Sequence, residues 1–169
     1  MAENWKVINP NKLKTRRILK EEASSSLSVL KESAFHKAKM GEVFDFFLSH
    51  SHIDKEYVTS VSEMLISAGF TVYIDWIVDK NERGEPVTKN NADLIRKRMH
   101  QCKRMLYLHT KGASDSKWCP WEIGIFDEFN GEVYVGLIAT EESSTTGQEY
   151  LDLYNRFYFD GNYWAPRRA

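Results

Sequence analysis

Glu122 is the residue whose place in the sequence most clearly suggests chemistry. Segment 117–130 has the spacing of a helix, and Pro120 is tolerated there because it falls in the first turn. Positions 118, 122, 125 and 129 share one face of that helix, and Glu122 is the only one of the four that is not apolar. A carboxylate on an apolar stripe costs free energy unless it is paired, hydrogen-bonded or protonated. We therefore expect Glu122 to have a specific environment.

The pattern by itself allows two interpretations of Glu122. The first is a structural glutamate near a helix N-terminus, where the helix dipole favours negative charge. The second is a carboxylate that lines a cleft, with the indole of Trp118 one turn earlier as an aromatic wall. An indole that packs against a ring, beside a carboxylate that faces positive charge, suits a flat, cationic ligand. The spacing does not decide between the two, and both stay open here.

The elements that must position Glu122 alternate between strand and helix from residue 42 onward. Short apolar runs predict strands at 43–48, 70–74, 104–108 and 133–138, with a fifth near 158–160. Helical spacing predicts helices at 54–68, 91–101 and 117–130, with a short helix or turn in 149–157. Polar stretches predict loops at 76–89 and 109–116. This alternation favours an α/β, flavodoxin-like fold: a three-layer sandwich with a central four- to five-stranded parallel sheet.

Folds of this kind bind ligands outside the carboxyl ends of their strands. That rule selects the loops that begin at Ser49, Asp75 and His109. The first 41 residues differ in composition, with a basic cluster followed by an imperfect helical stripe. We expect an N-terminal helical extension at 1–41 and one domain at 42–169.

The composition excludes several classes of function. A formal net charge of -1 gives no support for nucleic-acid binding. No apolar run approaches the roughly 20 residues that cross a bilayer, and the N-terminus lacks the apolar segment of a secretory signal. The two cysteines, Cys102 and Cys119, fit no zinc or CxxC pattern. We expect a soluble, cytoplasmic, reduced protein with no membrane contact.

Three stretches of this sequence together resemble a TIR (Toll/interleukin-1 receptor) domain. They are Phe44–Ser51 (FDFFLSHS), which is similar to the first strand of the family, Ala68–Asp75 (AGFTVYID), similar to its second strand, and Ser114–Glu122 (SDSKWCPWE), similar to its third box. The resemblance runs in order from about residue 43 to residue 160. It is strongest to bacterial stand-alone TIR proteins, whose C-terminal end Gln148–Tyr154 also resembles.

The resemblance implies an enzyme that cleaves the nicotinamide–ribose bond of NAD, with Glu122 as the catalytic residue. Nicotinamide would leave as a neutral group, and the carboxylate would stabilise the oxocarbenium-like ribose that remains. Water would then give ADP-ribose, whereas attack from within the dinucleotide would give a cyclic ADP-ribose-type signal. The sequence does not choose between these products. NAD is the substrate, and no metal or other cofactor is implied.

The resemblance also implies further substrate-binding residues, each with a structural alternative. Phe47, Ser49 and His50 match the end of the first strand, where the alternative for Phe47 is core packing. Asp75 matches the acidic residue that ends the second strand and is equally suited to capping a turn. Trp118 matches the aromatic wall.

The resemblance also suggests partners, and the sequence leaves two other functions open. Bacterial proteins of this type suggest antiphage defence, self-association and a separate effector or sensor protein. The alternative is a non-enzymatic TIR adaptor that signals by self-association. A metallohydrolase is a weaker alternative, because the histidine-rich stretch 50–54 would need a histidine where Lys55 stands.

Overall fold

The computed structural model describes residues 41–75, 88–137, 146–159 and 164–166. All of the helical extension predicted at 1–41 except Gly41, and most of the loop predicted at 76–89, lie outside these residues. The strands are β1 (Phe44–Ser49), β2 (Val72–Tyr73), β3 (Cys102–His109), β4 (Val133–Leu137), β5 (Asn155–Phe159) and β6 (Trp164–Pro166). The helices are η2 (His52–Asp54), α3 (Lys55–Ser67), α5 (Lys89–His100), α6 (Lys111–Asp115), α7 (Trp118–Asn130) and η3 (Glu149–Leu153), of which η2 and η3 are 3-10 helices.

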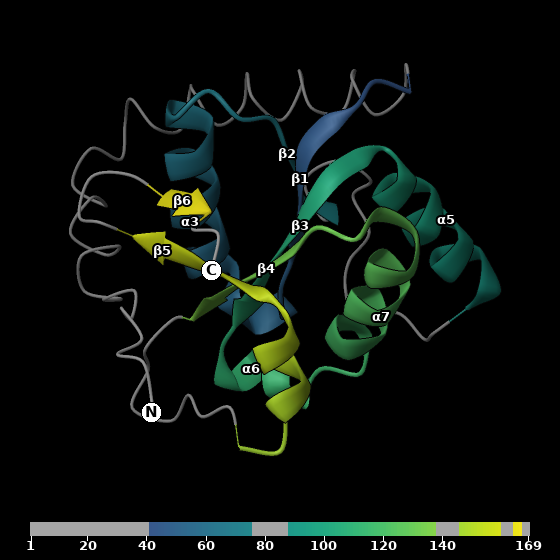
Figure 1. The fold of residues 1–169 in the computed structure, drawn as a ribbon. Helices are drawn as coiled ribbons and strands as arrows, with labels where there is room; N and C mark the ends of the chain where they lie inside the picture. The colour runs from purple at the N-terminus through teal and green to yellow at the C-terminus, as the bar shows by residue number, and fades with distance from the viewer. Residues whose placement is uncertain (1–40, 76–87, 138–145, 160–163, 167–169) are drawn as a thin grey trace.

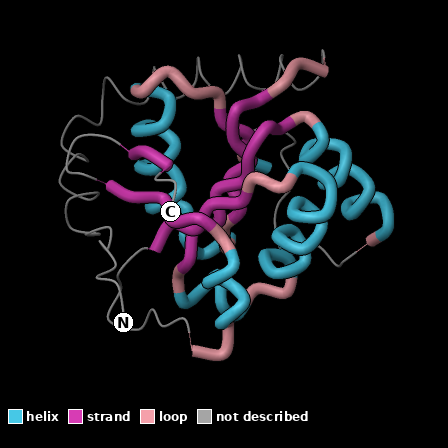
Figure 2. Tube along the Cα trace, viewed as in Figure 1, coloured by secondary structure: helices cyan, strands magenta, loops and turns pink. Residues whose placement is uncertain are grey.

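The strands form one sheet in the order β2-β1-β3-β4-β5-β6 (Figure 1). Strands β1 to β5 pair in parallel, and β6 is antiparallel to β5. The parallel part has the strand order of flavodoxin-like folds, so the predicted fold class is confirmed. Helices lie on both sides of the sheet, with α3 on one side and α5 and α7 on the other (Figure 2).

Alternation along the strands divides the core between the two faces of the sheet. Phe46 and Leu48 of β1 pack on the α3 side with Val58, Val61 and Leu65 of that helix. On the α5 and α7 side the buried cluster includes residues from β1, β3, β4 and both helices: Phe47, Met105, Tyr107, Val135, Met99, Ile123 and Phe126. Ser49, two residues after Phe47 at the carboxyl end of β1, also points toward α7.

Three predicted boundaries differ from the structure. The polar loop predicted at 109–116 is wrong, because it contains the short helix α6, whose N-cap Thr110 accepts a hydrogen bond from Ala113 N at 2.9 Å. Strand β5 begins at Asn155, inside the segment predicted as helix or turn, and β6 was not predicted. The end of α3 follows the prediction, since Gly69 stands just beyond it with a positive φ of 90°.

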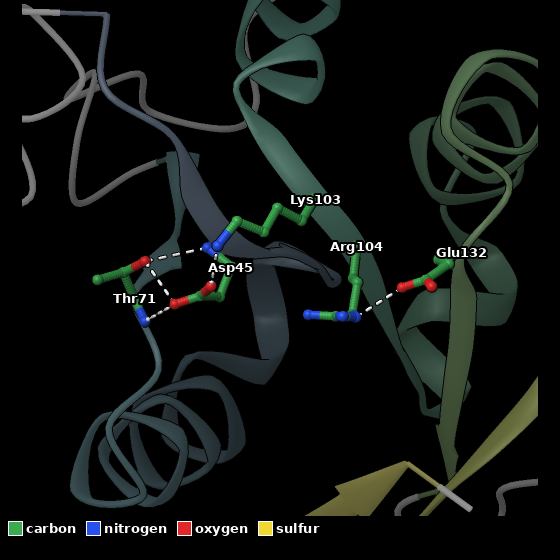
Figure 3. Close-up of polar contacts among 5 residues, drawn as sticks. All are labelled: Asp45, Thr71, Lys103, Arg104 and Glu132. Carbon is green, nitrogen blue, oxygen red and sulfur yellow. Dashed lines mark hydrogen bonds and ion pairs between the residues drawn. The ribbon is translucent and has the colours of Figure 1, made fainter. Parts of the chain in front are cut away.

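A polar clamp at the amino-terminal ends of the strands fixes β1 against its neighbours (Figure 3). The Asp45 carboxylate accepts hydrogen bonds from the backbone N–H and the hydroxyl of Thr71, both at 2.9 Å, and from Lys103 Nζ at 2.8 Å. Arg104 forms an ion pair with Glu132 at 2.6 Å, which joins β3 to the start of β4. These contacts are consistent with the strand register that continues to the carboxyl ends. Within the residues that the structure describes, no helix is long and apolar enough to span a membrane.

Candidate active site

The carboxyl ends of β1 and β2 bring polar side chains to one edge of the sheet. Ser49 pairs in register with Tyr107, and Phe47 pairs with Tyr73. Asp75 follows Tyr73 by two residues, and its Oδ1 lies 3.7 Å from Nε2 of His50, the residue after Ser49. The loops selected from the sequence at Ser49 and Asp75 are therefore adjacent in space.

Helix α7 carries Glu122 over this edge from the side of the sheet that Phe47 faces. Its first turn is held by the Ser116 hydroxyl, which accepts hydrogen bonds from Trp118 N at 3.2 Å and from Cys119 N at 3.3 Å. Glu122 is 0% exposed. The structure thus places the carboxylate in the interior, above the ends of the strands, and not on an open helix face.

The apolar stripe predicted on α7 is shifted in the structure. Fully buried positions are Cys119, Glu122, Ile123 and Phe126, whereas Trp118, Ile125 and Phe129 are only partly buried. The face that points at the sheet is therefore centred one position beyond the predicted stripe. The shift arises because the sheet, which the sequence did not place, decides which side of an apolar helix is covered.

Ser49 is the described partner of the Glu122 carboxylate. Its hydroxyl donates a hydrogen bond to Glu122 Oε2 at 2.5 Å, and both side chains are 0% exposed. This length lies in the range of charge-assisted O–H···O⁻ hydrogen bonds, which are stronger than neutral ones. Ser49 reaches Glu122 because it lies two residues after Phe47 and so shares the orientation of Phe47 toward α7.

His50 and Asp75 form a second buried pair next to the first. His50 Nδ1 lies 2.8 Å from the Leu48 carbonyl oxygen, which can only accept, so this nitrogen carries a proton. His50 Nε2 lies 3.7 Å from Asp75 Oδ1, and the two side chains are 0% and 6% exposed. This orientation directs the imidazole from β1 toward the end of β2.

The two aromatic residues predicted for the site have different environments. Phe47 is 1% exposed and stacks on Tyr73, with 5.2 Å between ring centroids, so its side chain is part of the core. Trp118 is partly buried and meets Trp121 edge to face at 5.1 Å. Arg96 of α5 lies over the Trp121 ring at 5.1 Å from its centroid. Of the two predicted aromatics, Trp118 is the one that solvent reaches.

Asp54 and Thr110 form a polar contact that the sequence analysis missed. The Thr110 hydroxyl donates to Asp54 Oδ2 at 2.5 Å and also accepts the N-cap hydrogen bond of α6. Burial raises the pKa of Asp54, although the hydrogen bond from Thr110 and the charge of His52 act in the opposite direction. The contact joins the loop after β1 to the loop after β3. A threonine at the start of a short polar segment is a typical N-cap signal and could have indicated α6.

The Glu122 carboxylate gives this arrangement the means to stabilise positive charge on a ligand. Glu122, Ser49 and His50 are all fully enclosed. The expectation of a carboxylate that lines a cleft stays a prediction. Among the described residues, no group of three or more His, Cys, Asp or Glu side chains could hold a metal ion.

Comparisons with known proteins agree with the resemblance found in the sequence. A family model described as "TIR domain" matches residues 46–163. The chain is 34% identical over 125 residues to the probable 3' cyclic ADP-D-ribose synthase ThsB' of Bacillus cereus (strain MSX-D12), covering 73% of this chain and 65% of that protein. It is 22% identical over 130 residues to the putative cyclic ADP-D-ribose synthase TIR2 of Cytobacillus dafuensis, covering 76% of this chain and 34% of that protein. The chain therefore spans less than two thirds of the length of either relative.

Among solved structures, the chain is similar to the TIR domain of the Toll-related receptor TRR-2 from Hydra magnipapillata. The TM-score is 0.48 and the sequence identity 13%, over 63% of this chain and 79% of that one.

Proposed function

Since this chain belongs to the TIR domain family, we propose that it is an enzyme that cleaves the nicotinamide–ribose bond of NAD, with Glu122 as the catalytic residue. One observation carries the proposal: the Glu122 carboxylate is fully buried at the carboxyl edge of the sheet and accepts a 2.5 Å hydrogen bond from Ser49. Burying an ionised carboxylate in the protein interior costs roughly several kcal/mol of free energy unless hydrogen bonds or charges around it offset the cost. A buried carboxylate is expected in a site that stabilises a cation, because its negative charge is not screened by water there.

The chemistry requires a negative charge and no metal. The C–N bond between ribose and nicotinamide breaks, and its electron pair leaves with the ring nitrogen, which becomes neutral. The ribose carbon gains oxocarbenium character, and the Glu122 carboxylate stabilises that positive charge in a water-poor environment. Ser49 holds the carboxylate in one orientation, so little reorganisation is needed as charge develops.

Other side chains have supporting roles in the proposal. Trp118 offers an aromatic wall one helical turn before Glu122 and is partly exposed. The buried pair of His50 and Asp75 shapes the strand ends beside Ser49. Phe47 acts through packing, because its side chain is enclosed by Tyr73 and Phe126.

We further propose a cyclic ADP-ribose-type product in preference to linear ADP-ribose. The names of both curated relatives support this choice, since each is named as a cyclic ADP-D-ribose synthase. In this reaction an atom of the same dinucleotide attacks the ribose carbon and loses its proton, so that no water is consumed. Chromatography of the products of an NAD reaction separates the cyclic compound from ADP-ribose.

The biological setting that we propose is bacterial antiphage defence in the cytoplasm. A cyclic product would act on a separate effector protein, and self-association would control the activity, as is typical of TIR domains. Cys102 and Cys119 are buried without a disulfide, which agrees with a reducing compartment. Activity that rises with protein concentration faster than linearly would support self-association.

The decisive experiment replaces Glu122 by glutamine. Glu122→Gln keeps the shape and an acceptor for Ser49 but loses the charge, so we expect release of nicotinamide from NAD to fall about 100- to 1,000-fold. Glu128→Gln is the matched control, because Glu128 is an exposed glutamate on the same helix. A folded Glu122→Gln variant that cleaves NAD at the wild-type rate contradicts the proposal. Wild-type protein that leaves NAD intact at high concentration would favour the adaptor function.

A further inference from the structure

The C-terminal turn that contains η3 lies beside the first turn of α7, at the same end of the sheet as α6 (Figure 1). Tyr150 of this turn packs against the buried cluster that includes Cys119 and Ile123 of α7. Cys119 lies three residues before Glu122 and faces the same way on the helix. The turn therefore packs against the core cluster that the buried face of α7, the face that carries Glu122, also joins.

Contacts on both sides of Tyr150 fix its position. Gln148 Nε2 donates to the Ser114 carbonyl oxygen at 3.2 Å, and the Tyr107 hydroxyl donates to Gln148 Oε1 at 3.5 Å. Four residues after Tyr150, the Tyr154 hydroxyl donates to Asp127 Oδ2 of α7 at 3.2 Å. The turn is thus tied to α6, β3 and α7, so the direction of the Tyr150 side chain is set by its surroundings.

The Tyr150 hydroxyl points inward and lacks a hydrogen-bond partner. The side chain as a whole is partly exposed, whereas the hydroxyl oxygen is buried and has no hydrogen-bond partner among the residues that the structure describes. An unsatisfied buried hydroxyl costs free energy, and most buried polar groups in native proteins are paired. A polar group of a bound ligand would satisfy this hydroxyl.

The electrostatic surroundings of Tyr107 agree with the placement of Tyr150 near Glu122. Burial, and then the neighbouring acidic groups Cys119, Tyr150 and Glu122, raise the pKa of Tyr107. Tyr107 pairs in register with Ser49, the residue that donates to Glu122. Tyr150 and Glu122 are therefore both close enough to Tyr107 to affect its ionisation.

We propose that the Tyr150 hydroxyl binds the dinucleotide, by a hydrogen bond to a polar atom of its nicotinamide–ribose half. This inference rests on the proposed function and assigns it a further substrate-binding residue. The C-terminal turn then takes part in substrate recognition, with Gln148 as a positioning residue that holds the turn against β3 and α6. Tyr150 and Glu122 would contact the same half of the substrate from two different elements.

The test compares Tyr150→Phe with Tyr57→Phe, because each removes one hydroxyl from a partly buried tyrosine and Tyr57 lies on α3, away from the C-terminal turn. Tyr150→Phe removes an unsatisfied group, so we expect a melting temperature equal to or above that of the wild type, with kcat/KM for NAD roughly 3- to 10-fold lower. Tyr57→Phe removes a hydroxyl on the opposite side of the sheet from the C-terminal turn, so we expect unchanged cleavage of NAD. Calorimetric titration with NAD of Glu122→Gln, with and without Tyr150→Phe, measures the same contact as binding.

Two results would overturn the inference about Tyr150 without overturning the proposed function. In an active wild-type background, a Tyr150→Phe variant with unchanged kcat/KM and unchanged NAD affinity shows that the hydroxyl does not meet the substrate. A Tyr150→Phe variant that melts below the wild type shows that the hydroxyl already has a partner in the folded chain. Wild-type protein that neither binds nor cleaves NAD overturns the proposed function as well, so the two failures are distinguishable.

Discussion

The Ser49 hydroxyl donates a 2.5 Å hydrogen bond to Oε2 of Glu122, although 73 residues separate the two in the sequence. The bond joins the carboxyl end of β1 to α7 inside the protein, where both side chains are fully buried. An enclosed carboxylate depends on such a donor, because water no longer solvates it. The pair therefore links the stability of the fold to the geometry of the candidate site.

A double-mutant cycle measures this link. We expect Ser49→Ala to lower the free energy of unfolding by about 1.5–3 kcal/mol, the range for a hydrogen bond to a charged group. In a Glu122→Gln background the acceptor is neutral, so we expect the same change to cost only about 0.5–1.5 kcal/mol. Urea unfolding of the four proteins gives both values. Equal costs in the two backgrounds would show that the charge of Glu122 is not what Ser49 stabilises.

Ser62→Ala provides the control for this cycle. Ser62 is 1% exposed, and its hydroxyl donates to the Thr59 carbonyl oxygen of the same helix at 2.8 Å. Loss of the Ser62 hydroxyl should lower the free energy of unfolding by the same amount whether residue 122 is glutamate or glutamine. This control separates the effect of removing any buried serine hydroxyl from the effect of removing the contact with Glu122.

Glycines 112 and 124 should respond in opposite ways to replacement by alanine. A Cβ at Gly112 would lie 2.6 Å from Ile53 Cγ1 and Cδ1 and 2.9 Å from Asp54 Oδ2, so we expect a loss of about 1–3 kcal/mol in unfolding free energy. A Cβ at Gly124 meets nothing within 4 Å, and alanine there should stabilise the helix by about 0.5–1 kcal/mol. Both glycines are helical, so helix propensity favours alanine at each. Thermal melting of the two variants compares them, and a Gly112→Ala protein as stable as Gly124→Ala would contradict the close packing.

Lowering the pH should weaken the contribution of the Asp45 carboxylate to the free energy of unfolding. Burial raises the pKa of Asp45, but the hydrogen bonds and charge of Lys103 and the hydrogen bonds of Thr71 outweigh it and lower the pKa from 3.8 to about 2. A lowered folded-state pKa gives stability that is present above pH 3.8 and is lost as pH falls toward 2. Because Lys103 is half exposed, we expect a contribution of about 1 kcal/mol after solvent screening.

The measurement is the difference in unfolding free energy between wild type and Asp45→Asn as a function of pH. That difference should shrink between pH 3.8 and 2, the window set by the two pKa values. Lys103→Met should narrow the window, since one of the groups that lower the pKa is gone. A difference that stays constant through this range would contradict the role of the Asp45 charge.

The sequence by itself determined the order of most elements and singled out Glu122, the residue that we propose as catalytic. Apolar runs and helical spacing predicted β1, α3, α5, β3, α7 and β4 to within a few residues, because burial and periodicity are local properties of the chain. Gly69 marked the end of α3 for a conformational reason that is also local. Glu122 was recognisable because a carboxylate on an apolar helix contradicts the pattern around it.

Only the tertiary structure decided which partners these residues have. The hydrogen bond from Ser49 to Glu122 depends on strand register and on the packing of α7, and neither is encoded in a local window of sequence. The same holds for Tyr150, whose inward-facing hydroxyl is set by contacts of Gln148 and Tyr154 with three other elements. Contacts between distant segments form when the whole chain buries its apolar surface, so spacing along the sequence does not predict them.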